Sequence, residues 1–352
     1  MQKKADGSCQ YTGVIHVHTT ESDGTKSLEE VVAIGRETGL EFMLFSDHMN
    51  LNNREAGKEG FYGDTLVLIG YEHNDLDDCH HYLLFDSPRV YPKDMTAAQY
   101  VAAGAADGAL GILAHPDEIR EAIVEHPAYP WKDWSVRGYN GIELWNQMSE
   151  WMEKLTPSNK LIMAFSPRKS MVGPTDRILR KWDELNRSRK VVGIAGVDAH
   201  AFPIKVGPLT VEIFPYKVHF RSLRCYIALP EELSRDLDRA RLQLYAAIRE
   251  CRLYFANVRW GDAENFEFWC ENSRRKVGSG GELNLEDGKT VIEVKTPEAA
   301  RLNLVRNGES IFCEKTDHIT YELSEPGLYR VEAWKGRRGW IFSNHIRVGG
   351  ES

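Results

Sequence analysis

Histidine and acidic residues stand directly after apolar runs up to residue 200, and they are the side chains best suited to chemistry. The stretch from Gly13 to Gly24 reads G-V-I-H-V-H-T-T-E-S-D-G. A strand alternates its side chains between two faces, so His16 and His18 are expected to point to the same side. Two imidazoles on one face can bind a divalent cation, but the pair is weak evidence alone and needs partners elsewhere in the chain.

Partners of suitable chemistry occur at the ends of later apolar runs. Asp198 and His200 in V-D-A-H repeat the spacing of His16 and His18, so a second segment is expected to present two ligands to one side. The candidate ligands are His16, His18, Asp23, His48, Glu72, His80 or His81, His115, Asp198 and His200. Imidazole and carboxylate ligands without thiolates suit zinc, manganese or ferrous iron, and the set exceeds what one ion needs. We therefore expect two or three divalent metal ions (Mn, Zn or Fe).

Alternating strands and helices are expected to position these ligands. Ser27 and Glu30 form a capping box and Gly39 is a helix stop, so the sequence predicts strand, helix, strand from Gly13 to Phe45. Further strands are expected at Thr65–Gly70, Tyr82–Phe85, Leu110–Ala114, Gly141–Trp145, Val191–Gly196, Thr210–Phe214 and Leu223–Leu229, and helices at Ala97–Ala106 and Leu237–Cys251. This order indicates an α/β barrel with polar residues on the rim where the strands end.

The character of the sequence changes near Val258. Short alternating runs separated by turn residues follow, and they read as a small all-β sandwich domain. We therefore expect an N-terminal tail (residues 1–10), a barrel (residues 11–257) and a β-sandwich (residues 258–352). The aromatic, proline-containing insertion Glu118–Gly141 reads equally as a lid over the rim or as a packed surface loop.

Bulk composition excludes several function classes. The chain has 352 residues and a formal net charge of -8, with no long Lys/Arg run, which argues against a long nucleic-acid partner. No apolar run approaches the roughly 20 residues that span a bilayer, so no membrane partner is expected. Six dispersed cysteines predict free thiols. The N-terminus lacks the apolar core of a signal peptide, which favours a cytoplasmic location unless an export signal was removed. The oligomeric state is not set by the sequence.

The ordered motifs resemble those of the PHP family, named for polymerase and histidinol phosphatase. They are H-V-H-T-T-E-S-D-G, S-D-H, the strand end at Glu72, His81 before an apolar run, A-H-P and V-D-A-H. The resemblance implies a distorted (β/α)7 TIM-like barrel with two or three metals. It assigns His16, His18, Glu72 and Asp198 to one ion, Glu72, His81 and His115 to a second, and Asp23, His48 and His200 to a third. Asp23 stands where some members carry histidine.

The C-terminal half resembles the branch of PHP proteins that includes carbaryl-hydrolase-like metallohydrolases. The matching residues are R-L-Y-F-A-N at Arg252–Asn257 and W-I-F-S-N at Trp340–Asn344, with His345 where proline would be expected. This second resemblance suggests carbamates, carboxylic esters or amides as alternative substrates.

A PHP-type centre implies hydrolysis by a metal-bridging hydroxide. The sequence therefore predicts a metal-dependent phosphoesterase that acts on a small, phosphorylated molecule. His200 or His48 would protonate the leaving oxygen. The candidates for substrate binding are Arg168, Lys169, Arg177 and Glu143, with solvated surface charge as the alternative for the basic residues and a structural role as the alternative for Glu143. The competing hypotheses are hydrolysis of uncharged esters, carbamates or amides, and a non-catalytic metal-containing binding protein.

Simpler explanations exist for some of these residues. Asp23 before Gly24 also fits an ordinary turn, and His80 competes with His81, which the resemblance favours. Exposed or capped histidine is the expectation for the remaining imidazoles, at His73, His126, His219, His318 and His345.

Overall fold

A computed structural model of the chain describes residues 2–4, 7–120, 127–206, 209–286 and 290–350. The chain divides into two compact units that are interleaved along the sequence. Unit 1 contains residues 1–12, 172–193 and 225–352, and unit 2 contains residues 13–171 and 194–224. This division differs from the expected parts 1–10, 11–257 and 258–352, because 172–193 and 225–257 group with the C-terminal strands.

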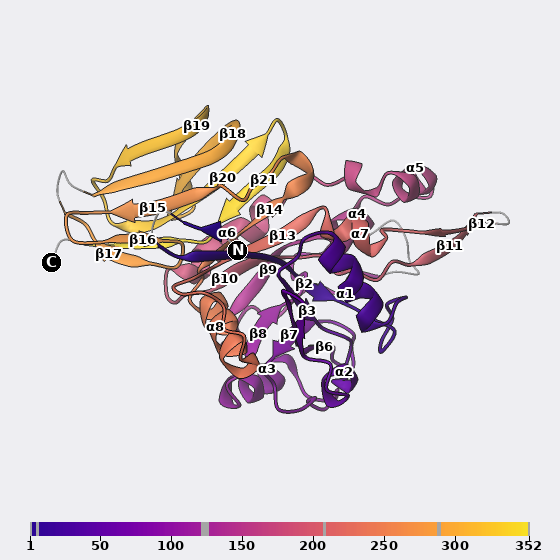
Figure 1. Cartoon of the computed structure of the whole chain (residues 1–352). Helices are drawn as coiled ribbons and strands as arrows, with labels where there is room; N and C mark the ends of the chain where they lie inside the picture. Colours follow the sequence, from indigo (N-terminus) through magenta and orange to yellow (C-terminus); the bar gives the residue numbers. More distant parts are fainter. Residues whose placement is uncertain (1, 5–6, 121–126, 207–208, 287–289, 351–352) are drawn as a thin grey trace. The chain divides into compact units, whose positions relative to one another are not determined.

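Unit 2 carries the alternating strands and helices (Figure 1). Its strands are β2 (Cys9–Val17, which begins in unit 1), β3 (Phe42–Phe45), β4 (Gly60–Tyr62), β5 (Thr65–Ile69), β6 (Tyr71–His73), β7 (Tyr82–Phe85), β8 (Leu110–Leu113), β9 (Gly141–Asn146), β10 (Val192–Gly196, which also begins in unit 1), β11 (Pro203–Val206) and β12 (Leu209–Glu212). Its helices are α1 (Leu28–Glu37), α2 (Asn52–Glu55), α3 (Ala97–Ala106), α4 (Gln147–Glu153), α5 (Lys160–Phe165), the 3-10 helix η1 (Pro167–Lys169) and α7 (Tyr216–Phe220).

Helix α1 begins at the predicted capping box. The Ser27 hydroxyl accepts a hydrogen bond from the Glu30 N–H, and the Glu30 carboxylate accepts one from the Ser27 N–H. The helix ends before Gly39, whose φ of +80° suits glycine. Leu28, Val31 and Val32 are buried, so one face of α1 packs into unit 2 and fixes the crossover from β2 to β3.

The strands of unit 2 follow a mixed pattern. β2, β3 and β5 run parallel, and β4 is antiparallel to β5. A second sheet has the order β10-β9-β8-β7-β6, in which β8 and β9 are parallel but β7 is antiparallel to both β6 and β8. No described helix separates β6 from β7, and a parallel pair needs a long crossover, so β7 reverses direction. The α/β class is confirmed, but the described strands lie in separate sheets and no closed barrel is found among them.

Unit 1 is rich in long strands, and β18 to β21 lie side by side (Figure 1). Its elements are β1 (Gln2–Lys3), α6 (Asp176–Asn186), β13 (Leu223–Leu229, which begins in unit 2), α8 (Leu237–Arg249), β14 (Leu253–Asn257), the 3-10 helix η2 (Val258–Trp260), β15 (Glu267–Glu271), β16 (Lys276–Gly278), β17 (Glu282–Asn284), β18 (Val291–Arg306), β19 (Glu309–Glu322), β20 (Gly327–Lys335), β21 (Arg338–Ser343) and β22 (Ile346–Gly349). After Asn257 the described residues thus form strands and one 3-10 helix, as expected. The two-layer sandwich stays a prediction.

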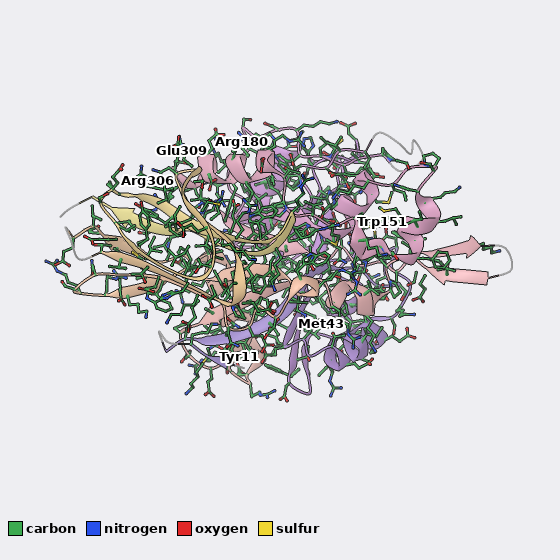
Figure 2. The ribbon with its side chains drawn as sticks, turned by 90° about the horizontal axis from the view of Figure 1, so that it is seen from above. Tyr11, Met43, Trp151, Arg180, Arg306 and Glu309 are labelled. Carbon is green, nitrogen blue, oxygen red and sulfur yellow. The ribbon has the colours of Figure 1, made fainter. Side chains whose placement is uncertain are left out.

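The sheet of unit 1 is antiparallel along the order β16-β15-β18-β20-β21-β14, and β19 pairs with β18. Arg306 and Glu309 face each other where β18 turns into β19 (Figure 2). β1 pairs with the start of β2, so the described part of the expected N-terminal tail is a paired strand. The six cysteines are free thiols, as predicted. Among the described residues, no helix has the length and apolarity to cross a membrane.

A buried ionic network ties α6 to β20 in unit 1. Arg330 donates to both oxygens of Asp183 at 2.7 and 2.8 Å, and His345 Nε2 lies 2.7 Å from Asp183 Oδ1. All three residues are buried. His345 is therefore not exposed, which was one of the two expectations for it. Burial alone would raise the pKa of Asp183, but hydrogen bonds from Arg330 and His345 lower it to about 2.

We expect Asp183→Asn to destabilise unit 1 by about 3 kcal/mol at pH 7, because it leaves the Arg330 guanidinium buried without its carboxylate. Since the folded pKa lies below the ordinary value of 3.8, the ionised form stabilises the fold above pH 4 and loses that effect as pH falls towards 2. Urea unfolding of wild type and variant should therefore differ most at neutral pH and converge on acidification.

Asp238→Asn is the matched control, because the Asp238 side chain is 83% exposed and pairs only with Arg241 among the ion pairs of the described residues. Its effect should stay within about 0.5 kcal/mol. Equal stabilities of Asp183→Asn and Asp238→Asn at pH 7 would contradict the role given to the buried network.

Candidate metal centre

The predicted ligand residues come together in unit 2, where strands end. Each residue of the set belongs to at least one of four groups whose ligand atoms lie within 4.8 Å of one another. The groups are His18, Asp23, His48 and His200; His16, His18 and Glu72; His16, His115 and Asp198; and His48, Glu72 and His81. The structure therefore gathers one cluster, which we call the ligand cluster, from residues that span positions 16 to 200.

The H-V-H motif at residues 16–18 and the D-A-H motif at residues 198–200 lie side by side at the centre of this cluster. Val17 and Ala199, the middle residues of the motifs, form a parallel bridge, with His18 N–H donating to Ala199 O at 3.1 Å. The backbone is not regular there: His16 has a φ of +71° and Asp198 one of +49°, and the β2–β3 register shifts between Ile15 and Val17. A bulge therefore aims His16 at the cluster, which simple strand alternation did not predict.

Glu72 of β6 joins two parts of the cluster through its two oxygens. Oε2 lies 2.9 Å from His16 Nε2 and 3.3 Å from His18 Nε2. Oε1 lies 2.8 Å from His81 Nδ1 and 3.2 Å from His115 Nε2. Asp198 Oδ1 approaches both His16 and His18 at 3.4 Å. One carboxylate is thus shared between two sets of imidazoles, the arrangement that a bridging ligand requires.

The third part of the cluster is its open side. Asp23 Oδ1 lies 3.1 Å from His200 Nε2, and Asp23 Oδ2 lies 3.8 Å from His48 Nε2. The side chains of Asp23 and His48 are 48% and 27% exposed, whereas His16, His18 and Glu72 are almost completely buried. A substrate can therefore reach the cluster from the Asp23 and His48 side.

His81 and not His80 faces the cluster. His81 Nδ1 contacts Glu72, while His80 Nδ1 lies 2.9 Å from Asp75 Oδ2 and its backbone φ is +55°. The turn before β7 thus points the two neighbouring imidazoles at different carboxylates. The resemblance favoured the residue that the structure places in the cluster.

Glu143 of β9 lies behind the cluster instead of facing a substrate. Its Oε1 is 2.9 Å from His16 Nδ1, and its Oε2 accepts hydrogen bonds from the His115 N–H at 2.7 Å and the Asn146 amide at 2.8 Å. Because one imidazole nitrogen of His16 is held by a carboxylate, the other is oriented towards Glu72. These contacts fit the structural one of the two roles open from sequence, and substrate binding by Glu143 stays a prediction.

Asp47 is a further positioning residue that sequence reasoning missed. It accepts hydrogen bonds from the Thr19 N–H and hydroxyl, both at 2.7 Å, and from the Ser22 hydroxyl at 2.8 Å. These bonds hold the turn that carries Asp23. Its position between Ser46 and His48 in S-D-H was the available signal, but nothing in that motif identified its partner.

The role of the basic substrate-binding candidates stays a prediction. Arg168 and Lys169 lie in η1 of unit 2, where Arg168 donates to the Arg221 carbonyl at 3.3 Å and Lys169 is exposed. Arg177 is exposed on α6 of unit 1. His126 lies outside the described residues. His219, expected to be ordinary, is fully buried, and burial lowers its pKa to about 3 although the charge of Asp198 acts in the opposite direction.

The carboxylates and imidazoles of the cluster shift each other's pKa. Burial alone would raise the pKa of Glu72 and of Asp198, but the surrounding histidines hold both well below their usual range. Burial alone would lower the pKa of His18 and His81, but hydrogen bonds and charges from carboxylates raise these to about 10 and about 9. The carboxylates therefore require positive charge close to them, which protons or metal ions can supply.

The donor set fits divalent metal ions. Imidazole and carboxylate atoms converge without any thiolate, and several buried imidazole nitrogens have no hydrogen-bond partner among the described residues. These are His18 Nε2, His48 Nδ1, His81 Nε2 and His115 Nδ1, each of which faces a carboxylate oxygen at 3.3–3.8 Å without the geometry of a hydrogen bond. A buried polar atom without a partner costs about 1–3 kcal/mol, and coordination of a metal ion removes that cost. The cluster can thus bind divalent metal; its arrangement sets neither the element nor the number of ions.

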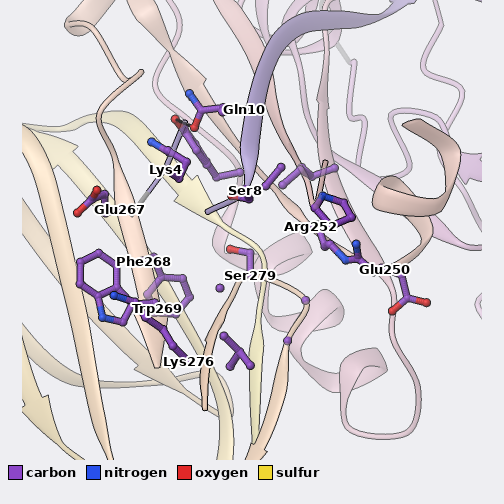
Figure 3. A pocket seen from close by; sticks show the side chains of 18 of the residues that line it. Lys4, Ser8, Gln10, Glu250, Arg252, Glu267, Phe268, Trp269, Lys276 and Ser279 are labelled. Atoms are coloured by element: carbon purple, nitrogen blue, oxygen red, sulfur yellow. Dashed lines mark hydrogen bonds between the residues drawn. The ribbon is translucent and has the colours of Figure 1, made fainter. Parts of the chain in front are cut away.

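A separate cleft of about 680 Å³ lies within unit 1 (Figure 3). Trp269 and Lys276 line one side and Glu250 and Arg252 another, and Lys276 Nζ lies 3.6 Å from the centre of the Trp269 ring. None of the metal-ligating groups found among the described residues lies in this cleft. The candidate metal ligands among the described residues therefore lie in unit 2 and not in this cleft.

Glu143→Gln is expected to weaken metal binding about tenfold, because a neutral amide holds the His16 ring less firmly than a carboxylate does. Gly196→Ala should act in the same direction, since a Cβ there would lie 1.4 Å from Glu143 Oε1 and displace that side chain. Equilibrium dialysis with elemental analysis measures the change. Glu37→Gln, at an exposed ion pair on α1, is the control. Wild-type metal affinity in both Glu143→Gln and Gly196→Ala would exclude the orienting role.

Comparison with known proteins gives distant structural likeness only. No family model and no curated protein matches the sequence. A two-domain Bacteroides vulgatus protein, whose PHP-like metal-dependent phosphoesterase assignment is itself a prediction, is similar over 97% of this chain and 96% of its own, at 12% identity and a TM-score of 0.46. PsfC from Pseudomonas syringae is similar over 65% and 87%, at 12% identity and a TM-score of 0.38. A Bifidobacterium adolescentis protein, also only provisionally assigned as a metal-dependent phosphoesterase, is similar over 56% and 92%, at 15% identity and a TM-score of 0.31.

Proposed function

We propose that this chain is a metal-dependent phosphoesterase that hydrolyses a small phosphorylated substrate. The observation that carries the proposal is Glu72, whose two oxygens belong to two different sets of imidazoles beside a solvent-exposed carboxylate at Asp23. A carboxylate shared in this way is suited to hold two cations close together, which is the arrangement used for hydrolysis of phosphate esters.

Three ligand sets are proposed within the cluster. His16, His18, Glu72 and Asp198 would hold one ion; Glu72, His81 and His115 a second; and Asp23, His48 and His200 a third. Divalent ions held there would lower the pKa of a shared water and neutralise charge on the substrate oxygens. Manganese, zinc and ferrous iron all suit this donor set.

His200 or His48, where not engaged by the third ion, is the proposed proton donor to the leaving oxygen. Burial lowers the pKa of His48 to about 4, so its imidazole is neutral at pH 7 and better suited to binding metal. His200 is held between the Asp198 carbonyl, 3.0 Å from Nδ1, and Asp23, 3.1 Å from Nε2. This placement beside the open side favours His200 for proton transfer.

Two finer features of the fold are also proposed. The parallel bridges Val17 to Ala199 and His48 to Glu72 join the two sheets of unit 2 and support a distorted, TIM-like (β/α)7 barrel. We propose residues 11–257 as the hydrolase module and residues 258–352 as a β-sandwich accessory module. Arg168, Lys169 and Arg177 remain candidates for binding the anionic substrate.

Purified protein loaded with manganese, zinc or ferrous iron should hydrolyse members of a phosphomonoester and phosphodiester panel, and chelation should abolish turnover. His200→Gln should lower kcat about 100-fold, the contribution typical of a proton donor. His318→Gln, a half-exposed histidine of β19, should not.

The same panel separates the competing functions. Absence of metal-dependent turnover on every phosphate ester would sink the phosphoesterase proposal. Turnover of aryl carboxylic esters or carbamates, with inorganic phosphate failing to inhibit, would replace it with the carbamate and ester hydrolase.

A further inference from the structure

Two aromatic side chains flank the open side of the ligand cluster. The Tyr129 ring stacks on His81, with centroids 4.9 Å apart and planes at 10°, and the Phe202 ring stacks on His200 at 4.8 Å and 13°. His48 lies between these pairs, with its ring centroid 5.6 Å from that of His81 and 6.5 Å from that of His200. A chain of ring contacts thus runs from Tyr129 through His81, His48 and His200 to Phe202.

Their positions are fixed by the chain and not by apolar packing alone. The Tyr129 N–H donates to Glu118 Oε2 at 2.8 Å, and the Arg120 guanidinium lies 5.6 Å from the Tyr129 ring centre. Phe202 comes two residues after His200 and remains 38% exposed. A large apolar side chain with that exposure contributes little burial to the stability of the fold. Phe202 lies beside the candidate metal ligand His200 and is accessible to a substrate.

The segments around the cluster carry further exposed apolar side chains. Leu76 follows β6, Ile119 follows β8, and α5 follows β9 and contributes Leu161, Ile162 and Phe165. β6, β8 and β9 run in the same direction, since β6 and β8 are both antiparallel to β7 and β9 is parallel to β8. These segments therefore leave the strands at the end where Glu72 and His115 lie. Exposed apolar side chains therefore occur in several of the segments that follow these strands.

We propose that Tyr129 and Phe202 are specificity-determining residues that select phosphate esters whose leaving group carries a planar aromatic ring. The inference rests on the proposed phosphoesterase function and names its substrate class. The phosphate sits at the cluster beside Asp23 and His48, and the aromatic part of the leaving group packs against one or both rings. Neither residue takes part in the bond-breaking step.

Arylalkyl and alkyl phosphates with the same primary alkoxide leaving group provide the test. With 3-phenylpropyl phosphate and propyl phosphate, wild-type protein should show at least a tenfold higher kcat/KM for the phenyl compound, since stacking on one aromatic side chain is worth about a factor of ten. Tyr129→Leu and Phe202→Leu should each reduce this ratio several-fold, and together they should bring it close to one. Phe165→Leu, an exposed aromatic of α5 that stacks on no described imidazole, should keep the ratio.

A binding measurement separates this inference from the function on which it rests. Calorimetric titration of the metal-loaded protein with 3-phenylpropylphosphonate and propylphosphonate needs no turnover and should show the same tenfold preference, lost in the double variant. If the protein discriminates between the phosphonates but hydrolyses no phosphate ester, the phosphoesterase proposal is wrong and the role of Tyr129 and Phe202 in binding an aromatic ring is supported. Equal Kd values in wild type would overturn the role proposed for Tyr129 and Phe202. A preference that survives both substitutions would also overturn it, as would a loss of bound metal in the variants by elemental analysis.

Discussion

Glu72 is a buried carboxylate, and the structure of unit 2 depends on placing positive charge and hydrogen-bond donors around it. Moving such a charge out of water costs several kcal/mol unless partners replace the lost hydration. The partners are imidazoles from separate segments: His16 and His18 at the end of β2, His81 before β7 and His115 after β8. The buried charge of Glu72 therefore brings together segments that are far apart in the sequence. The same requirement makes the site attractive to cations.

The backbone around this carboxylate is held in conformations that side-chain-bearing residues rarely adopt. His16, His115 and Asp198 have φ values of +71°, +28° and +49°. Such conformations cost of order 1–3 kcal/mol each and persist only where the surroundings over-determine them. Here the Val17–Ala199 bridge fixes two of these positions, and the Glu143 carboxylate ties the His16 ring to the His115 N–H. The strain is thus concentrated at ligand positions and is offset by hydrogen bonds immediately behind them.

The residues of the ligand cluster could be named from the sequence because few residue types bind divalent metals and because they stand at strand ends. The geometry that brings these residues together could not be predicted from the sequence. Alternation along β2 named His16 and His18, although a bulge at His16 sets the actual direction of that side chain. Glu143 lies 127 positions from His16 in sequence, so only the folded chain shows that it orients an imidazole. The grouping of 172–193 with the C-terminal strands likewise depends on distant contacts such as Asp183 with Arg330.

Recognition of the substrate obeys weaker chemical constraints than metal binding does. A ligand position accepts histidine, aspartate or glutamate and little else, whereas a rim position accepts almost any side chain. Tyr129 and Phe202 are ordinary residues by type, and only their stacking on His81 and His200 distinguishes them. Both stand in segments that follow strands, outside the regular elements. The candidate metal centre is therefore constrained by residue type, whereas the segments around it are free to vary.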